Sequence, residues 1–312
     1  MKILFTGASS FTGFWFVKRL ASAGHQMICP LRDSGEKYEG VRKRRMEQIQ
    51  AACHLLPSSP FGSENFLKVA RQEKFDLLCH HAAEVTDYKS PSFDAMAALA
   101  SNAHHLRLVL KTLNCPVLLT GSVFENDEGA DPQQNKANAE GEGLRAFSPY
   151  GLSKGMTFQF FRYYCHEAGV PLGKFVIPNP FGPFEEARFT AHLMKTWRES
   201  RVAEVKTPDY LRDNIHVDLL AEVYAQFAQR VAAMESGCVK INPSGYAEKQ
   251  GEFAKRVARE VEARMGWKCE LKLPKQEDFG EPMSRVNTEP TATLVPNWNE
   301  AKAWDGFVDF YT

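Results

Sequence analysis

The sequence predicts an α/β fold: a doubly wound parallel sheet with a smaller C-terminal α/β lobe. Three observations lead to this prediction. A glycine turn over residues 7–13 joins an apolar run to a helical segment, apolar runs and helical periodicity then alternate to residue 177, and the alternation becomes irregular from Pro178 onward. We expect one domain over residues 1–177 and mainly a second lobe over 178–312, with segments of the second part returning to the sheet.

The N-terminal segment organises the chain. Lys2–Thr6 is short and apolar, as in a buried strand, and Phe11–Ala23 has helical periodicity that places Phe14, Val17, Leu20 and Ala21 on one face. Gly7 permits the turn between them, and Gly13 allows close packing. Such a turn directs backbone N–H groups and the positive end of a helix at one point, which suits a pyrophosphate. Taken alone, the stretch also fits a strand–turn–helix without a ligand.

The remaining elements follow in order. Strands are predicted at Gln26–Leu31, Phe75–His80, Pro116–Thr120 and Leu172–Ile177. Helices are predicted at Val41–Ala52, Glu64–Glu73, Phe93–Leu113, Tyr150–Ala168 and Val217–Met234, the last returning to the sheet. We expect a polar surface loop over Asn126–Phe147 and a rigid turn over Pro178–Pro183.

Composition excludes several function classes. The chain has 312 residues, a formal net charge of zero and no apolar run of membrane-spanning length, so we expect neither a nucleic-acid partner nor a membrane partner. The seven cysteines are scattered without Cys-x-x-Cys pairs, and the N-terminus carries no signal-peptide pattern, which together favour a cytoplasmic protein with reduced thiols. His80 and His81 should point to opposite faces of a strand, so we expect no metal site.

The strongest chemical signal is Tyr150-Gly-Leu-Ser-Lys154. Residues four apart on a helix are neighbours, and a lysine ammonium about 4 Å from a phenol lowers its pKa by roughly three units at an effective dielectric near 20. A tyrosine with a pKa shifted in this way can exchange protons near neutral pH. The alternative is an ordinary pair on a helix surface.

Further segments match one family in chain order. Gly7-x-x-Ser10-x-x-Gly13 resembles its glycine-rich turn, with Ser10 in place of the middle glycine, and Thr120-Gly-Ser-Val-Phe124 resembles its Ser/Thr-x-x-Val-Tyr segment. His80-His-Ala-Ala83, Pro178-Asn-Pro-Phe-Gly-Pro183 and Arg212-Asp-Asn-Ile-His-Val-Asp218 resemble three later motifs. Over residues 1 to about 220 the chain is similar to extended short-chain dehydrogenases/reductases of the NAD-dependent epimerase/dehydratase type, which implies a Rossmann-like fold.

The resemblance assigns roles to individual residues. The catalytic group comprises Thr120, which would hydrogen-bond the reacting oxygen, Tyr150, which would exchange the proton, Lys154, and Asn102, which would hold the water of that lysine. Ser122 and Asn179 would contact the substrate, Ser122 also being the alternative to Thr120, and the forked guanidinium of Arg212 suits a diphosphate. The cofactor site would comprise Gly7, Ser9, Ser10, Phe11, Thr12, Gly13, Arg32, His81, Ala82, Ala83 and Pro178, together with Tyr150 and Lys154.

Three positions depart from the family pattern. Leu31-Arg32 stands where an acidic residue would bind the adenosine ribose, and the aspartate expected near adenine is missing around Leu55–Ser59. The first departure favours NADP over NAD, through Arg32 and one of Arg42, Arg44 and Arg45, although Asp33 could also reach the ribose. The third is Gly121-Ser122 in place of the Asp-Glu pair of sugar dehydratases, which argues against dehydration.

These observations predict an NAD(P)-dependent epimerase of a nucleotide-diphosphate sugar. An NADPH-dependent ketoreductase could use the same residues, and a non-catalytic NADP-binding regulatory protein could keep the fold. The helices at 93–113 and 150–168 are both long, and the second carries more aromatic surface than one sheet face requires, so we also expect a homodimer through these helices, the alternative being that the C-terminal lobe covers this surface.

Overall fold

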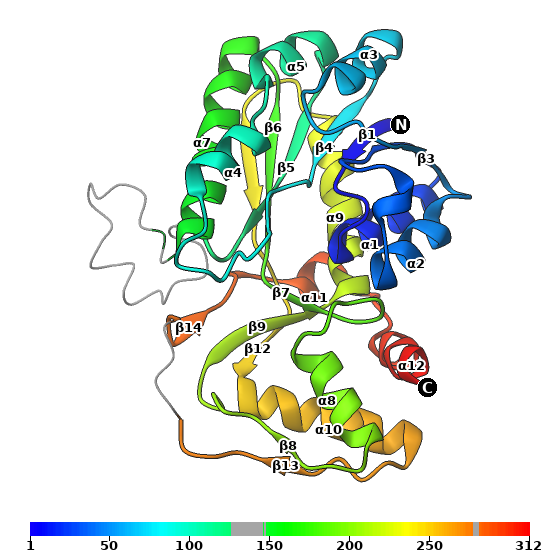
Figure 1. Cartoon of the computed structure of the whole chain (residues 1–312), viewed down its shortest axis with the longest axis vertical. Coiled ribbons are helices and arrows are strands. Elements are labelled where there is room, and N and C mark those ends of the chain that lie inside the picture. Colours follow the sequence, from blue (N-terminus) through cyan, green and yellow to red (C-terminus); the bar gives the residue numbers. More distant parts are fainter. Residues whose placement is uncertain (126–145, 147, 277–280) are drawn as a thin grey trace.

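The structure is a computed structural model that describes residues 1–125, 146, 148–276 and 281–312 (Figure 1). The loop predicted over Asn126–Phe147 therefore lies almost wholly outside the described residues.

A seven-stranded parallel sheet forms the centre of the molecule, in the order β10-β6-β5-β4-β1-β2-β3. Its strands are β1 (Lys2–Thr6), β2 (Gln26–Pro30), β3 (Cys53–Leu56), β4 (Leu77–His80), β5 (Val117–Ser122), β6 (Leu172–Ile177) and β10 (Cys238–Ile241). The order reverses between β1 and β4, and clefts form at such a reversal, outside the carboxyl ends of the strands. The predicted doubly wound α/β fold is confirmed.

Helices cover both faces of this sheet (Figure 1). One face packs against α1 (Phe11–Ser22) and α9 (Val217–Ala232), with α2 (Gly40–Ile49) beside α1. The opposite face packs against α3 (Glu64–Gln72), α5 (Leu106–Leu113) and α7 (Pro149–Ala168), with α4 (Ala95–Asn102) beside α7. A short 3-10 turn, η1 (Gly35–Lys37), precedes α2.

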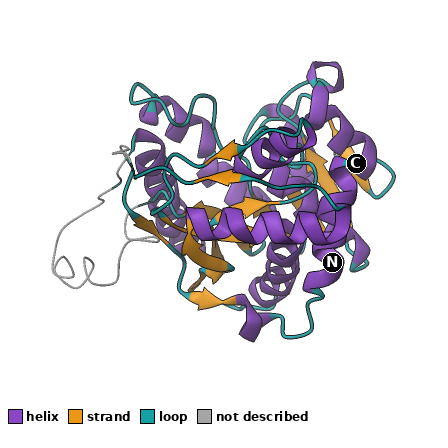
Figure 2. Ribbon diagram, turned by 90° about the horizontal axis from the view of Figure 1, so that it is seen from below, coloured by secondary structure: helices purple, strands orange, loops and turns teal. Residues whose placement is uncertain are grey.

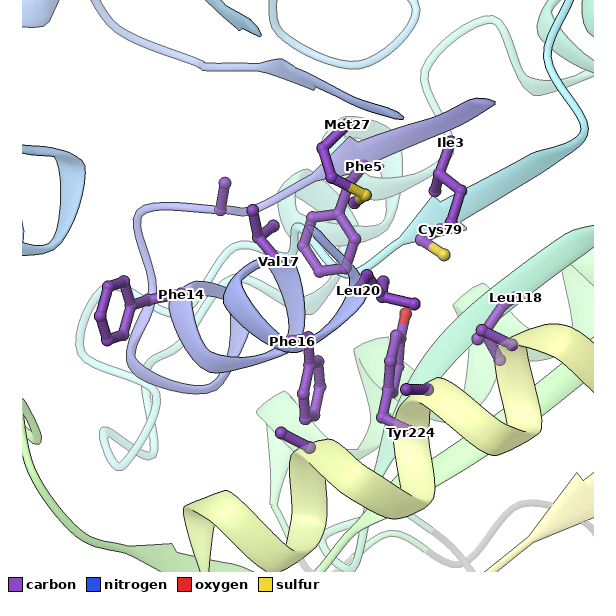
Figure 3. Close-up of a cluster of buried hydrophobic side chains, with 14 of the residues drawn as sticks. Ile3, Phe5, Phe14, Phe16, Val17, Leu20, Met27, Cys79, Leu118 and Tyr224 are labelled. Carbon is purple, nitrogen blue, oxygen red and sulfur yellow. The ribbon is translucent and has the colours of Figure 1, made fainter. Parts of the chain in front are cut away.

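Aromatic packing joins α1 to α9 beneath the sheet. The rings of Phe16 and Tyr224 stack with centroids 3.9 Å apart, and both lie close to Phe175 of β6 (Figure 3). The side chains of Phe5 and Leu118 reach the same cluster from β1 and β5. Residues 217–232 therefore complete the core of the N-terminal half, as the prediction that this helix returns to the sheet requires.

A smaller C-terminal lobe lies at the carboxyl ends of the strands and faces the viewer in Figure 2. Its helices are α8 (Phe189–Arg198), α10 (Gln250–Met265), α11 (Thr291–Leu294) and α12 (Glu300–Tyr311). Its strands are β7 (Asn179–Phe181), β8 (Ala203–Glu204), β9 (Leu211–His216), β11 (Pro243–Ser244), β12 (Tyr246–Lys249), β13 (Leu271–Lys272), β14 (Ser284–Arg285) and β15 (Glu289–Pro290). The division of the chain at residue 177 stays a prediction, although β10 and α9 belong spatially to the first half.

Two predicted elements differ from the structure. The single helix expected over Phe93–Leu113 is two helices, because His105 adopts a left-handed conformation with φ of 49° between α4 and α5. The rigid turn expected over Pro178–Pro183 contains the short strand β7, which pairs with β9 and carries the chain into the C-terminal lobe. Within the described ranges, none of the helices has the length and apolar character needed to cross a bilayer.

Candidate active site

The glycine-rich turn lies against the end of β4. Gly7 has φ of +84°, and a Cβ atom there would lie 2.8 Å from the backbone nitrogen of Ala82. The turn therefore tolerates no side chain at this position. The amides of Phe11 and Thr12 belong to the first turn of α1, where helix geometry supplies no acceptor, so these donors and the positive helix end fit a pyrophosphate.

Ser10 replaces the middle glycine of the turn and stabilises it. Its hydroxyl donates a hydrogen bond to the Gly7 carbonyl at 2.9 Å and accepts one from the Gly13 amide at 3.1 Å, which makes Ser10 the N-cap of α1. An N-cap serine stabilises a helix by about 1 kcal/mol relative to alanine. The substitution therefore supplies a cap that a glycine lacks.

His81 connects the turn to β5. Its Nε2 atom lies 3.0 Å from Ser10 Oγ and 3.1 Å from Thr12 Oγ1, while Nδ1 lies 3.0 Å from Thr120 Oγ1. Because the Ser10 hydroxyl hydrogen goes to Gly7, we assign Nε2 as the protonated nitrogen and Nδ1 as the acceptor of the Thr120 hydrogen. Burial, with smaller effects of Lys154 and His80, lowers the pKa of His81 to about 3, which keeps the ring neutral.

His80 points to the opposite face, as predicted, and holds Asn102. The Thr6 hydroxyl accepts from the amides of His81 and Ala82, so its own hydrogen is available to His80 Nδ1 at 3.0 Å. Nε2 of His80 then donates to the Asn102 carbonyl at 2.9 Å. The Asn102 side chain accepts from the Glu84 amide and donates to Thr157 of α7, so Asn102 joins the end of β4 to α7. Its role in holding a water for Lys154 stays a prediction.

Tyr150 lies at the start of α7 in an aromatic surround. Its ring centroid lies 5.3 Å from that of Tyr88 and 5.8 Å from those of Phe93 and Phe124. Burial raises the pKa of Tyr150 above its ordinary value, Glu125 and Tyr88 add to the rise, and Arg188 and a hydrogen bond with Ser122 oppose it. The prediction that Lys154 governs this pKa is wrong for the structure described here, in which burial outweighs every charge.

Lys154 follows Tyr150 by one helical turn and is buried. Its ammonium donates to the Thr120 carbonyl at 2.7 Å, which explains why it is not directed at the phenol. Burial lowers the pKa of Lys154, Glu125 raises it and Lys174 lowers it. Lys154 therefore places its positive charge at the carboxyl end of β5, beside the glycine-rich turn.

The hydroxyl groups of Thr120 and Ser122 have different hydrogen-bond partners. The Thr120 hydroxyl contacts His81, whereas the Ser122 hydroxyl contacts Tyr150 and also accepts from the Phe124 amide at 3.3 Å. Of the two candidate hydroxyls, Ser122 is therefore the one beside the phenol.

The basic residues near the predicted adenosine end differ in availability. Arg32 is half exposed and donates to Glu84 at 2.9 Å, with Asp33 3.5 Å away. Arg45 is fully buried and donates to the carbonyls of Ser9 at 3.1 Å and Phe184 at 3.0 Å, and to Glu186 at 2.7 Å. Arg45 thus clamps the turn to the lobe junction and is wrong as a candidate for the 2′-phosphate.

The guanidinium of Arg44 lies over Phe184 and Phe310, 5.4 and 5.3 Å from the ring centroids.

Ala83 continues the segment that begins at Ala82, and Pro178 lies between β6 and β7 at the same edge of the sheet. The predicted cofactor residues therefore surround the carboxyl ends of β1, β2, β4 and β6.

The substrate end of the site is built on β7 and β9. Asn179 donates to Asn214 Oδ1 at 2.6 Å. Arg212 stacks on Tyr210, with its guanidinium carbon 4.4 Å from the ring centroid, and donates to Glu281 at 3.3 Å. Glu281 also pairs with Arg285, and burial together with Arg285 lowers the pKa of Arg212 to about 10.

The sequence reasoning missed Arg285, Glu281, Glu125 and Lys174. Only Lys174 had a signal, a charge inside the apolar run Leu172–Ile177. In the part of the chain that the structure describes, no group of three His, Cys, Asp or Glu side chains could hold a metal ion.

Comparisons with known proteins concern the family and the fold of the chain. The family model described as "NAD dependent epimerase/dehydratase family" matches residues 3–241. A search of curated protein sequences gave no significant match.

Among solved structures, the chain resembles UDP-glucose 4-epimerase from Stenotrophomonas maltophila with bound NAD and formylated UDP-arabinopyranose, with TM-score 0.74, 13% identity, and coverage of 100% of this chain and 98% of that chain. It also resembles UDP-glucuronic acid 4-epimerase from Bacillus cereus in complex with UDP-glucuronic acid and NAD, with TM-score 0.72, 16% identity, and coverage of 100% and 99%. At these identities the likeness concerns the fold.

Proposed function

The chain belongs to the NAD-dependent epimerase/dehydratase family, and from this premise we propose that it is an NAD(P)-dependent nucleotide-sugar epimerase that acts by reversible hydride transfer at a sugar carbon. One observation carries the proposal: Ser122, Tyr150 and Lys154 lie together at the carboxyl ends of the strands, next to the turn held by Ser10 and His81.

The residues of the site divide the work. Tyr150 moves the proton of the sugar hydroxyl at its phenolic oxygen, and Ser122 hydrogen-bonds the same sugar oxygen. The nicotinamide, when bound, supplies the acceptor and donor of the hydride. Because burial and Glu125 keep the phenol protonated, Tyr150 is set up as the proton donor. A rotation of Lys154 from the Thr120 carbonyl toward the ribose and the phenol would favour the phenolate.

Cofactor binding would rest on the turn and on Arg32. The amides at the start of α1 would hold the pyrophosphate, and Gly7 and Gly13 allow the turn to pack closely, because a Cβ atom at either position would collide with neighbouring protein atoms. We propose a preference for NADP(H), because Leu31 replaces the carboxylate that would repel a 2′-phosphate and Arg32 follows it. The pairing of Arg32 with Glu84 limits the preference to about tenfold.

The proposed substrate is a nucleotide-diphosphate sugar. Arg212 and Arg285 lie side by side at the substrate end, and two guanidinium groups suit the two phosphates. Glu281 bridges these arginines in the structure, so the diphosphate would displace it.

We also propose a homodimer formed through α5 and α7. Leu108, Phe160 and Tyr163 are 43%, 39% and 64% exposed on these helices, beside a groove of about 680 Å³ lined by Phe160 and Tyr164. A second copy would cover this apolar face. Light scattering at micromolar concentration should give twice the chain mass, and a monomer mass would exclude the dimer.

The free cysteines support a cytoplasmic location.

The test of the function is turnover of a panel of nucleotide sugars with product analysis, in the wild type and in Tyr150→Phe. The wild type should interconvert one pair of epimers without net change of cofactor. Tyr150→Phe should lose turnover and keep nearly the same cofactor affinity, because the phenol acts only in proton transfer. Net consumption of reduced cofactor would indicate a ketoreductase, and near-parental kcat in the variant would refute the assignment of Tyr150.

A further inference from the structure

Lys174 breaks the pattern of the strand that contains it. β6 lies inside the parallel sheet between β5 and β10, where strands are normally apolar on both faces. Lys174 is nevertheless 4% exposed at the centre of that strand. A buried lysine requires a partner that compensates for its lost hydration, so the surroundings of Lys174 need an explanation.

The partner is Glu125, three residues after the end of β5. Its carboxylate lies 2.7 Å from the Lys174 ammonium, and the two side chains are only 1% and 5% exposed. The other carboxylate oxygen accepts a hydrogen bond from the Ser122 amide at 2.8 Å. The Lys174 ammonium also lies 4.2 Å from the ring centroid of Phe158 on α7. The pair therefore ties together the end of β5, the centre of β6 and α7.

Gly121 makes room for this pair. A Cβ atom at position 121 would lie 2.8 Å from Lys174 Cε and 2.9 Å from Glu125 Oε1. The glycine has an ordinary strand position in β5, so its function here is space and not backbone conformation. It follows that the glycine in the Gly121-Ser122 departure from the family pattern provides the space that the Lys174–Glu125 pair occupies.

The pair lies directly behind the proton-transfer residues. Glu125 acts electrostatically on both Tyr150 and Lys154, and Lys174 acts on Lys154. The other groups that face Tyr150 are Tyr88 and Arg188, from outside α7. Two buried ammonium groups thus lie in the field of one carboxylate, and loss of Glu125 would remove an attractive negative charge from both.

We propose that Glu125, clamped by Lys174, is a positioning residue of the active site, which fixes the Ser122 backbone beneath the Tyr150 phenol and balances the charges of Lys154 and Lys174. The proposal rests on the proposed function for its effect on turnover, but not for its effect on Lys154. If Glu125 had a purely structural role, its loss would lower the stability of the fold and leave the pKa of Lys154 unchanged. If Glu125 is a positioning residue, its loss should shift the pKa of Lys154.

The test compares Glu125→Gln with Lys174→Met. Loss of the carboxylate should lower the pKa of Lys154, and loss of the second ammonium should raise it, each by about one unit. The first readout is an NMR titration of ¹³C-labelled lysine side chains, with the Lys154 signal assigned through Lys154→Arg. The second is the pH dependence of kcat, whose limbs should move to lower pH in Glu125→Gln and so change activity about tenfold at a fixed pH on a limb.

Glu262→Gln is the matched control, because Glu262 also accepts a backbone amide, that of Cys269 at 3.1 Å, but lies in α10. It should leave both readouts unchanged. Glu125→Asp, which keeps the charge, should retain most of the wild-type titration and thereby show that the shift in Glu125→Gln comes from the lost charge; if Glu125→Gln does not fold, the shift in Lys174→Met decides the test. Lys154 titrating unchanged in both test variants would overturn the proposal. Opposite shifts in a protein that turns over no nucleotide sugar would support it while refuting the proposed function.

Discussion

The Nδ1 atom of His81 lies 3.0 Å from Thr120 Oγ1, and this contact commits the hydroxyl hydrogen of Thr120. On the other side of the His81 ring, the Ser10 hydroxyl donates its hydrogen to the Gly7 carbonyl, so Nε2 must be the protonated nitrogen that donates to Ser10. Nδ1 is then the acceptor, and Thr120 donates its hydroxyl hydrogen to it. The sequence motif selects Thr120 as the hydroxyl for the substrate, whereas we propose Ser122 for that role, because its hydroxyl is the one beside Tyr150.

Two isosteric substitutions separate these hydroxyls. Ser122→Ala should lower kcat by about 10²-fold or more, because the hydroxyl beside Tyr150 is lost. Thr120→Val should keep most of kcat and lower the free energy of unfolding by about 1–3 kcal/mol, because His81 loses its hydrogen-bond donor. Steady-state kinetics and urea unfolding of both variants provide the check. A larger loss of kcat in Thr120→Val would return the catalytic role to Thr120.

Cofactor preference should depend on Arg32 and Glu84 in opposite ways. Arg32→Ala should weaken NADP(H) binding by about tenfold and leave NAD(H) binding nearly unchanged. Glu84→Gln should strengthen NADP(H) binding several-fold, because its carboxylate lies 2.9 Å from Arg32 and competes with a phosphate.

Fluorescence titration of both cofactors at one fixed salt concentration measures these effects. Arg71→Ala is the control, since Arg71 forms a similar exposed pair with Glu64 at 2.7 Å, in α3. Equal affinities of the wild type for the two cofactors would exclude the preference.

Glu281 should compete with the substrate for two arginines. Arg212→Ala should weaken the binding of the nucleoside diphosphate of the sugar that is turned over by about tenfold or more, and Glu281→Gln should strengthen it several-fold, because a neutral side chain no longer competes for Arg212 and Arg285. Calorimetric titration measures both changes. Glu248→Gln removes the carboxylate of another Arg–Glu pair in the same lobe, with Arg256 at 2.8 Å, and should have no effect. Weaker binding in Glu281→Gln would mean that the glutamate supports the site.

Acidification should destabilise the fold below about pH 6.5. Burial lowers the pKa of His80 and His81 to about 3 and that of His216 to about 4, so all three stay neutral when folded and bind protons only after unfolding. Each should then cost about 1.4 kcal/mol of unfolding free energy per pH unit below its unfolded pKa. Glu185, whose pKa burial raises to about 7, and Asp213, whose pKa burial also raises, act in the opposite sense but are fewer than the three histidines.

The check is the melting temperature between pH 7.5 and 4.5. It should fall progressively on the acid side, and His81→Gln should flatten the dependence, whereas the exposed His166→Gln should not. A melting temperature that stays constant down to pH 5 would contradict the assignment of neutral buried histidines.

Local pattern was sufficient for five of the seven strands of the sheet, and β3 and β10 were not predicted. β1 and β6 occupy the residues that the sequence predicts, because a buried parallel strand is a short apolar run bounded by turn residues. The break at His105 was not predictable in the same way. Apolar periodicity continues across residues 103–106, and a left-handed residue leaves no trace in that pattern.

The site was predictable where one segment carries the chemistry, as with Tyr150 and Lys154 on α7. It was not predictable where the relevant quantity depends on several segments. The pKa of Tyr150 is raised mainly by its burial among rings from two other segments, and the arginines of the substrate end come from β9 and β14. Spacing along the chain does not contain these distances.

The edge strand β10 has a consequence for synthesis of the chain on the ribosome. When residue 177 has emerged, β1 to β6 exist, but the outer edge of β6 is unpaired and the face that α9 will cover exposes Phe5 and Phe16. Both remain open until residues 217–241 follow, after β7, α8, β8 and β9 of the C-terminal lobe have been made. An unpaired strand edge and uncovered apolar face attract other chains. We therefore expect the nascent chain to be most prone to association with other chains between the emergence of residue 177 and that of residue 241.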